Sequence, residues 1–406
     1  MKRIFTSYTI LCSLLFTGSI AHAQEFPITV DKYYSPYMGA NLFRSGLSIF
    51  SSVDDEYLPD FSGEYCFSAK LARSSKTMLE SFLSNWAKVA QHEYFGHGAR
   101  AREFGMYNVA YEINFFHGAT YYAPGTFAAL NVNQQAALSA GGMEATTVLA
   151  RELELDILDT DDLDYRTGIL YLFNSLDQTM YVFGATPQTF HADSNNDIGS
   201  YITEVNQWLG YQDTQLDLRG LRHKMLWDLA DPMLYLSLYA WWQYIYCGET
   251  TLGYSRLFIG EMSMMPTTRT LLAPYGPEFQ LLLHLYNADD KYIGVYLRTG
   301  HTGGKTSYGA DLYVLPLAKG NKWQIGNKLS VWHQPHLLKP VPGKNDPDKY
   351  GFGDFLTFSY QFTKEISTIA ECGYKTSGYL VGTPLSRNLI WRIGFNIDCS
   401  GRKKGC

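Results

Sequence analysis

The residues with the clearest chemical potential form one short run, His92-Glu93-Tyr94-Phe95-Gly96-His97. Two histidines beside a glutamate on one helix are a zinc-binding pattern, usually spaced H-E-x-x-H because residues i and i+4 face the same way. Here one more residue separates the histidines, and on a regular helix residues i and i+5 diverge by roughly 140°. A π-bulge, which absorbs one residue into a wider turn, would realign the two imidazoles. We therefore predict a π-bulge in this run and a metal ion shared by its histidines.

The run resembles the H-E-x-x-G-H motif of the dipeptidyl-peptidase III family of zinc exopeptidases. Residues 98–105 are similar to the segment after the motif in site-2-type and other H-E-x-x-H peptidases. The resemblance implies that His92 and His97 bind zinc, that Glu93 is the general base, and that a glutamate on a later helix is a third ligand. It is confined to residues 92–105, and the family's E-E-C-R-A-E/D motif is absent. The alternative for Glu93 and His97, four residues apart, is a surface pair worth a few tenths of a kcal/mol.

For the third ligand we predict Glu144, in the run Ala140-Gly141-Gly142-Met143-Glu144-Ala145. A helix is expected there, and its small residues would let it approach the motif helix closely. A carboxylate would complete a two-histidine, one-carboxylate site with a fourth position open to water. Zinc would activate that water, and Glu93 would take its proton as it attacks an amide carbonyl. Other acidic residues remain alternatives for the third ligand: Glu152, Glu154, Asp228 and Asp231.

Three side chains in or beside an expected edge hairpin, residues 108–123, could stabilise a transition state. His117, Tyr121 and Tyr122 each carry a group able to hydrogen-bond a developing oxyanion. For His117, a turn position without a chemical role is the simpler interpretation.

A second polar run imitates the ligand positions of a calcium loop. It consists of Asp193, Asn195 and Asp197, with Glu204 eleven residues after Asp193. The sixth position of the loop, where glycine is wanted, is Ile198. An acidic loop that caps the following helix explains these residues equally well.

Two kinds of periodicity divide the chain. From about residue 75 to 246 it is helical, and an apolar stripe predicts one long helix over 76–104 that carries the histidine motif. Further helices are expected over 133–155, 162–182, 199–209 and 218–246. From residue 252 onward, alternating segments separated by turn-forming clusters predict an antiparallel meander. These segments are 253–260, 277–287, 291–300, 306–316, 322–333, 352–363, 365–376 and 387–398.

The predicted fold class is α+β, with a helical zincin-like domain over residues 24–250 and an antiparallel β domain over residues 251–406. The β domain is expected to be a water-soluble meander or a barrel of about eight strands in an outer membrane, since alternating strands of ~10 residues suit both. The 31 tyrosines would supply the aromatic girdles of a barrel. The alternative function is therefore an outer-membrane barrel with a non-catalytic helical appendage, in a structural or transport role.

The N-terminus indicates export. Lys2 and Arg3 precede a short apolar stretch and Ala21-His22-Ala23, so residues 1–23 are predicted to be a secretory signal peptide. We expect a location in the periplasm or outer membrane of a Gram-negative-type bacterium. The net charge of −6, with no basic cluster, argues against nucleic acid. The predicted activity is zinc-dependent hydrolysis of a peptide or protein, and hydrolysis of wall or lipid amides is a weaker alternative.

Overall fold

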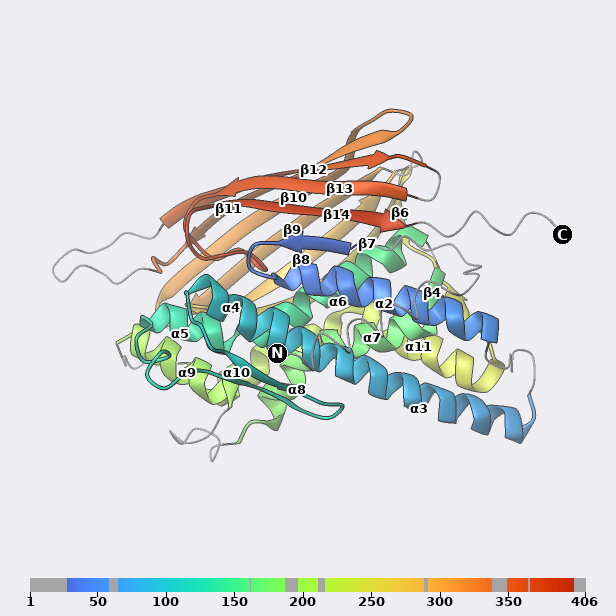
Figure 1. Ribbon diagram of the computed structural model, residues 1–406, viewed down its shortest axis with the longest axis horizontal. Coiled ribbons are helices and arrows are strands. Elements are labelled where there is room, and N and C mark those ends of the chain that lie inside the picture. Colours follow the sequence, from blue (N-terminus) through green and yellow to red (C-terminus); the bar gives the residue numbers. More distant parts are fainter. Residues whose placement is uncertain are drawn as a thin grey trace.

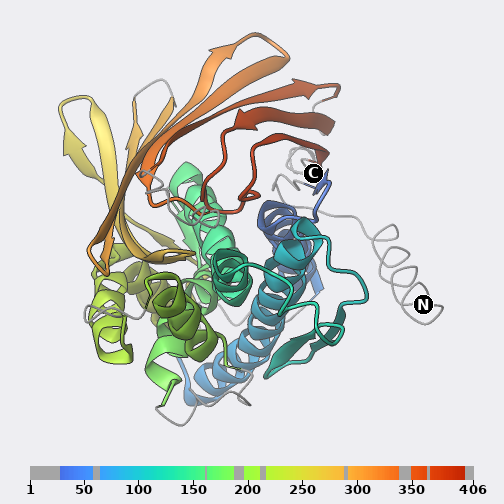
Figure 2. The same cartoon turned by 90° about the vertical axis from the view of Figure 1, so that its left-hand side faces the viewer.

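The computed structural model describes residues 28–57, 65–160, 162–186, 196–210, 216–287, 291–337, 349–363 and 366–397. The predicted signal peptide lies outside these residues. The fold is α+β: a layer of helices packs under one large antiparallel sheet (Figure 1). Figure 2 shows that the sheet curls over the helical layer. Among the described residues, no helix is both long enough and apolar enough to cross a bilayer.

The helical layer contains α2 (Pro36–Tyr57), α3 (Phe67–Ala90), η1 (Gln91–His97), α4 (Gly98–Glu103), α5 (Val132–Ser139), α6 (Gly141–Thr160), α7 (Tyr165–Ser175), α8 (Asp177–Gly184), α9 (Asp197–Trp208), α10 (Leu218–Met225), η3 (Leu226–Ala230) and α11 (Pro232–Cys247). The predicted helix over 76–104 is thus a continuous run of α3, η1 and α4 that begins earlier, at Phe67. The predicted helix over 218–246 is divided where Asp231 caps the N-terminus of α11 and Pro232 occupies its first turn.

The large sheet follows the order β1-β14-β13-β12-β11-β10-β9-β8-β7-β6, so β1 and β6 are its two ends. Its strands are β1 (Ile28–Asp31), β6 (Leu257–Ile259), β7 (Met262–Ala273), β8 (Gly276–Tyr286), β9 (Tyr292–Thr302), β10 (Lys305–Lys319), β11 (Trp323–Gln334), β12 (Lys349–Gln361), β13 (Ile366–Lys375) and β14 (Asn388–Ile397). The predicted meander is present from β6 to β14. Sequence periodicity missed β7, and it missed β1, which pairs with β14 from the other end of the chain.

Two short hairpins accompany the main sheet. The first pairs β2 (Ala110–Ile113) with β3 (Gly118–Tyr121), and it is the edge hairpin expected over 108–123. The second pairs β4 (Asp162–Asp164) with β5 (Thr251–Gly253).

One hydrophobic core joins the helices to the sheet. Leu149 and Leu153 of α6 and Tyr171 of α7 belong to the same buried cluster as Met265 and Leu271 of β7. The domain boundary expected near residue 250 falls between α11 and β5, and this core extends across it. The helices therefore pack against the sheet through this core, and the histidine motif lies within the helical layer.

Candidate metal centre

The predicted π-bulge is present. Residues Gln91–His97 form a π-helix that continues α3 and leads directly into α4. Its wider turn brings the two imidazoles to the same side, with ring centroids 5.0 Å apart. Both rings are buried. The extra residue of the motif is therefore absorbed by the backbone, as the spacing requires.

His92, His97 and Asp197 form a group that could hold a metal ion, because one ligand atom from each lies within 4.8 Å of the others. The Oδ2 atom of Asp197 is 3.2 Å from Nε2 of His92 and 3.3 Å from Nε2 of His97. Ligands that surround zinc tetrahedrally at about 2.0–2.1 Å lie about 3.3–3.4 Å from one another. The two distances from Asp197 to the histidines thus match the separation of ligands around a metal ion. Asp197, with its side chain 25% exposed, is the open side of the group.

The other nitrogen of each ring is held by an acceptor. Nδ1 of His92 lies 2.9 Å from Oδ2 of Asp177, and Nδ1 of His97 lies 2.7 Å from the carbonyl oxygen of Leu138. A carbonyl can only accept, so Nδ1 of His97 carries a proton, and Nε2 is the ring nitrogen that faces Asp197. Metal-binding histidines are commonly supported in this way by a carboxylate or a backbone carbonyl.

Carboxylates dominate the electrostatics around the two rings. Burial by itself would lower the pKa of His92, but the Asp177 and Asp197 carboxylates outweigh burial and raise this pKa to about 10. Burial would likewise raise the pKa of Asp197, but the two histidines hold it far below its usual range. An environment that favours positive charge so strongly on the imidazoles also favours a divalent cation between them.

Close packing of α6 against η1 depends on glycines. A Cβ atom on Gly142 would overlap the His92 ring, and one on Gly96 would lie 2.6 Å from the carbonyl oxygen of Gly141. The small residues of this run therefore do allow the close approach that the sequence predicts.

The predicted third ligand, Glu144, is not part of the group. Its carboxylate accepts hydrogen bonds from Arg100, with Nη2–Oε1 at 2.7 Å and Nε–Oε2 at 3.0 Å, and from the amide of Gly382 at 2.7 Å. Gly142 is the α6 residue that faces His92, and two residues further along a helix the direction has turned by about 200°. Glu144 therefore points away from the histidines, and Asp197 is the carboxylate that faces them.

The alternative acids also have other partners. Glu152 pairs with Arg44, Glu154 with His284 and Arg269, Asp228 with Thr179 and Thr270, and Asp231 with Tyr171 and the amide of Met233.

Glu93 is buried beside the group. Its Oε2 accepts a hydrogen bond of 2.6 Å from Oγ1 of Thr120 on β3. A Cβ atom on Gly118 would lie 2.5 Å from Cγ of Glu93, so the hairpin packs directly on this side chain. The Glu93 charge also contributes to the raised pKa of both His92 and His97. Its carboxylate is thus held in a fixed position near both rings.

The three side chains predicted in or beside the hairpin differ in their surroundings. Tyr122 is half-buried, and its burial, reinforced by the charges of Asp197 and Glu93, raises the pKa of its phenol, which remains a hydrogen-bond donor. Tyr121 instead donates to Glu112 at 3.0 Å on the exposed side of the hairpin. His117 is exposed and pairs with Glu112 as well.

Asp193 and Asn195 of the predicted calcium loop lie outside the described residues. Asp197 faces the two histidines instead. Glu204, two turns further along α9, is buried, and burial, reinforced by Asp197, raises its pKa to about 8 against the opposing hydrogen bond from Ser139. Of the described residues of this run, Asp197 thus belongs to the histidine group, and Glu204 does not.

Sequence reasoning missed the roles of Asp177, Thr120 and Tyr181. The Tyr181 ring stacks on His92, with centroids 5.0 Å apart and an interplanar angle of 17°. None of the three has a fixed spacing from the motif. The one available signal is that Asp177 and Asp197 each begin a helix.

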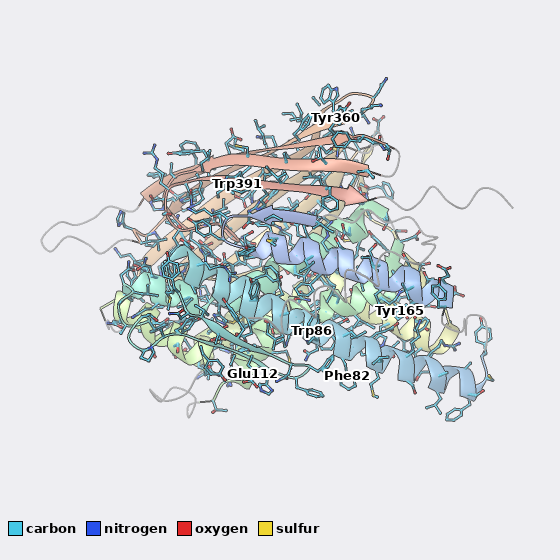
Figure 3. All side chains as sticks on the ribbon, in the orientation of Figure 1. Phe82, Trp86, Glu112, Tyr165, Tyr360 and Trp391 are labelled. Carbon is cyan, nitrogen blue, oxygen red and sulfur yellow. The ribbon has the colours of Figure 1, made fainter. Side chains whose placement is uncertain are left out.

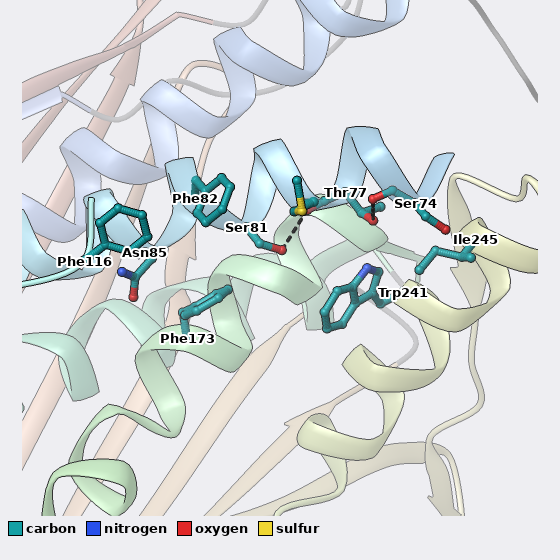
Figure 4. Close-up of a pocket in the computed structure, with 10 residues that line it drawn as sticks. Ser74, Thr77, Ser81, Phe82, Asn85, Phe116, Phe173, Trp241 and Ile245 are labelled. Atoms are coloured by element: carbon teal, nitrogen blue, oxygen red, sulfur yellow. Dashed lines mark hydrogen bonds between the residues drawn. The ribbon is translucent and has the colours of Figure 1, made fainter. Parts of the chain in front are cut away.

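A separate cavity of about 470 Å³ runs along α3 (Figure 4). Its lining is mostly apolar and includes Phe173 of α7 and Trp241 of α11. At one end it reaches Asn85 and Phe116, which belongs to the loop of the hairpin that carries Thr120. No member of the histidine group lines it.

Comparisons with protein-family models, with curated proteins and with solved structures find no match to this chain. The function is therefore inferred from the geometry of the site.

Proposed function

We propose that the protein is a zinc-dependent hydrolase that cleaves amide bonds, with a peptide or protein as its substrate. The observation that carries this proposal is the convergence of His92, His97 and Asp197, each through one atom, beside the buried carboxylate of Glu93. In this proposal the helical layer is a zincin-like domain in which Asp197 provides the carboxylate ligand.

The ligand set fits zinc. Two histidines and one carboxylate leave a fourth position for water or substrate, as in catalytic zinc sites. Zinc, when bound there, supplies Lewis-acid activation of a water molecule and of the substrate carbonyl. The supporting contacts from Asp177 and Leu138 hold the two rings in the tautomer that directs Nε2 toward the ion.

The chain's own residues supply the proton transfer. Glu93, fixed by Thr120, is positioned to take a proton from the attacking water and to return it to the leaving amine. Tyr122 keeps its phenolic proton and can donate to the oxygen on which charge develops. His92 and His97 remain ligands and do not move protons.

A redox role for the same ligands is less well supported. Two histidines and one carboxylate also bind iron(II) in oxygenases, which leave the neighbouring positions open. A buried glutamate adjacent in sequence to a ligand, and held by its own hydrogen bond, has its natural role in hydrolysis.

The test uses the purified full chain, equilibrated with zinc and then freed of excess metal. Metal analysis is expected to find one zinc per chain in the wild type and less than a tenth of that in His97→Ala. Glu93→Gln is expected to keep zinc and to lose activity on a peptide library by about 10²- to 10⁴-fold. Glu112→Gln, on the exposed side of the hairpin, is the matched control and keeps both. A wild type without zinc, or full activity in Glu93→Gln, overturns the proposal.

A further inference from the structure

The large sheet has an inverted polarity. On β9, β10 and β11 the side chains that face the helices include Arg298, Asp311 and the inward-pointing Lys328, of which the first two are buried. The residues next to them in sequence, Leu297, Leu312 and Leu329, lie on the opposite face and are exposed. An antiparallel sheet with one face in water normally places its apolar side chains on the covered face and its polar ones outside.

The apolar outer face is continuous from strand to strand. Val30 of β1 pairs with Ile393 of β14, which pairs with Ala370 of β13 and through it with Phe358 of β12. In the described parts of β11–β14, the only outward Asp, Glu, Lys or Arg is Asp354, and its Oδ1 accepts a hydrogen bond of 2.7 Å from Asn327. The exposed apolar side chains therefore form one continuous patch, whereas soluble proteins normally expose apolar residues singly.

Helix α3 shows the same inversion on the other side of the molecule. Its buried face includes Arg73 and Glu80, whereas Leu79, Phe82 and Trp86 are exposed. Figure 3 shows Phe82 and Trp86 on this helix, on the opposite side of the molecule from Tyr360 and its sheet. One interface with a partner chain would cover only one of these two sides, whereas a lipid phase that surrounds the molecule would cover both.

The dimensions of the outer face also match a bilayer. Aromatic side chains lie at both ends of β12: Tyr350 continues a row with His333 and Tyr308, with successive ring centroids 4.7 Å apart, and Tyr360 pairs in register with Trp323. The ten residue-to-residue steps from Tyr350 to Tyr360 span about 34 Å along the strand. With the tilt of about 40° that is usual for membrane strands, this length projects to about 26 Å, close to the apolar band of about 25 Å between aromatic girdles.

We propose that the outer face of the sheet, from β9 to β14 and β1, contacts the acyl chains of a lipid bilayer. This inference does not depend on the proposed hydrolase activity. It explains why polar side chains face inward on the sheet and on α3, and why the aromatic residues gather at the strand ends.

The test is flotation of the full chain with phosphatidylcholine vesicles in a density gradient. Wild-type protein is expected to float. The double variant Leu356→Arg/Ile393→Arg, at outer positions 51% and 58% exposed, is expected to float at least ~10-fold less, since arginine in the middle of a lipid-facing strand is strongly disfavoured. The matched control Tyr107→Arg/Met180→Arg, at positions 81% and 67% exposed outside the sheet, is expected to float like the wild type.

A second measurement does not depend on the folding of the charged variant. Vesicles with brominated acyl chains are expected to quench tryptophan fluorescence, and Trp391→Phe is expected to reduce that quenching. Wild-type protein that stays at the bottom of the gradient as a monomer overturns the proposal. A lipid-free dimer in light scattering that does not float also overturns it, because a second copy would then cover the face.

Discussion

Two buried polar clusters lie one after the other on the same helical run, and their chemistry differs. Around η1, the carboxylate of Asp197 pairs with His92 and His97, which carry charge only when protonated. On α4, Arg100 donates to Glu144 and to Glu103, so each of these carboxylates has a permanent cation beside it. In the second cluster the carboxylate charges are balanced by Arg100 without any bound ion. In the first cluster a divalent cation would balance the charge of the carboxylate. Burial and acidity alone therefore do not identify a metal-binding carboxylate, and the nature of its partner does.

The largest expected effects on stability and on zinc binding come from two substitutions, one at Glu144, which pairs with Arg100, and one at Asp197, which faces the histidines. Glu144→Gln removes one of the two carboxylate partners of the buried Arg100 guanidinium and leaves Glu103 as the other. We expect the free energy of unfolding to fall by about 1.5–3 kcal/mol, the range for a hydrogen bond to a charged group, with zinc still bound. Asp197→Asn should instead lose zinc while the metal-free protein unfolds at nearly the wild-type denaturant concentration. Denaturant unfolding and metal analysis of both variants decide the matter. The reverse pattern would restore Glu144 as the ligand.

Beside the η1 cluster, Tyr121 and Tyr122 should differ in their effect on catalysis. Tyr122→Phe removes the donor that we place at the developing oxyanion, and kcat should fall about 10²- to 10³-fold with zinc retained. Tyr121→Phe, on the exposed side of the hairpin, should keep its activity. Steady-state kinetics on a peptide substrate measures both, and equal rates in the two variants would remove Tyr122 from the chemistry.

Asp177 tests the support behind the ligands. Asp177→Asn keeps the volume but weakens the hold on Nδ1 of His92, so zinc affinity should fall about 10- to 100-fold. Competition with a fluorescent chelator measures this affinity. Asp228→Asn is the control, because Asp228 is equally buried but bonds to Thr179 and Thr270 instead. A loss of similar size in the control would indicate a general structural effect.

The smallest effect is expected at the exposed pair of His117 and Glu112. His117→Ala should change the free energy of unfolding by less than about 1 kcal/mol, because solvent screens surface pairs. Zinc affinity and kcat should stay at wild-type values. Thermal unfolding and the same kinetic assay check this, and a large loss of kcat would return His117 to the site.

The elements were predictable wherever the pattern is local. Two-residue alternation located β8 to β14, and helical periodicity located most of the helical layer. Pairings between distant segments were not predictable in this way. β1 is four residues long, too short for an alternating pattern, and it joins the sheet by pairing with β14. β7 was not predicted from its sequence and is identified in the structure by its pairing with β6 and β8. Alternation along β12 also groups Leu356 with Phe358, but it does not say which face the helices will cover.

In the candidate site, too, local spacing predicted some features and tertiary packing decided the others. The spacing of His92, Glu93 and His97 predicted the π-bulge on the premise that both histidines face one ion, because the direction of a side chain on a helix follows from its position in the chain. The third member was decided by the tertiary structure. The rotation of α6 turns Gly142 toward His92 and Glu144 toward Arg100, and the start of α9 brings Asp197 to the histidines from 100 residues away. Such contacts depend on how separate helices pack, and no local period in the sequence records that packing.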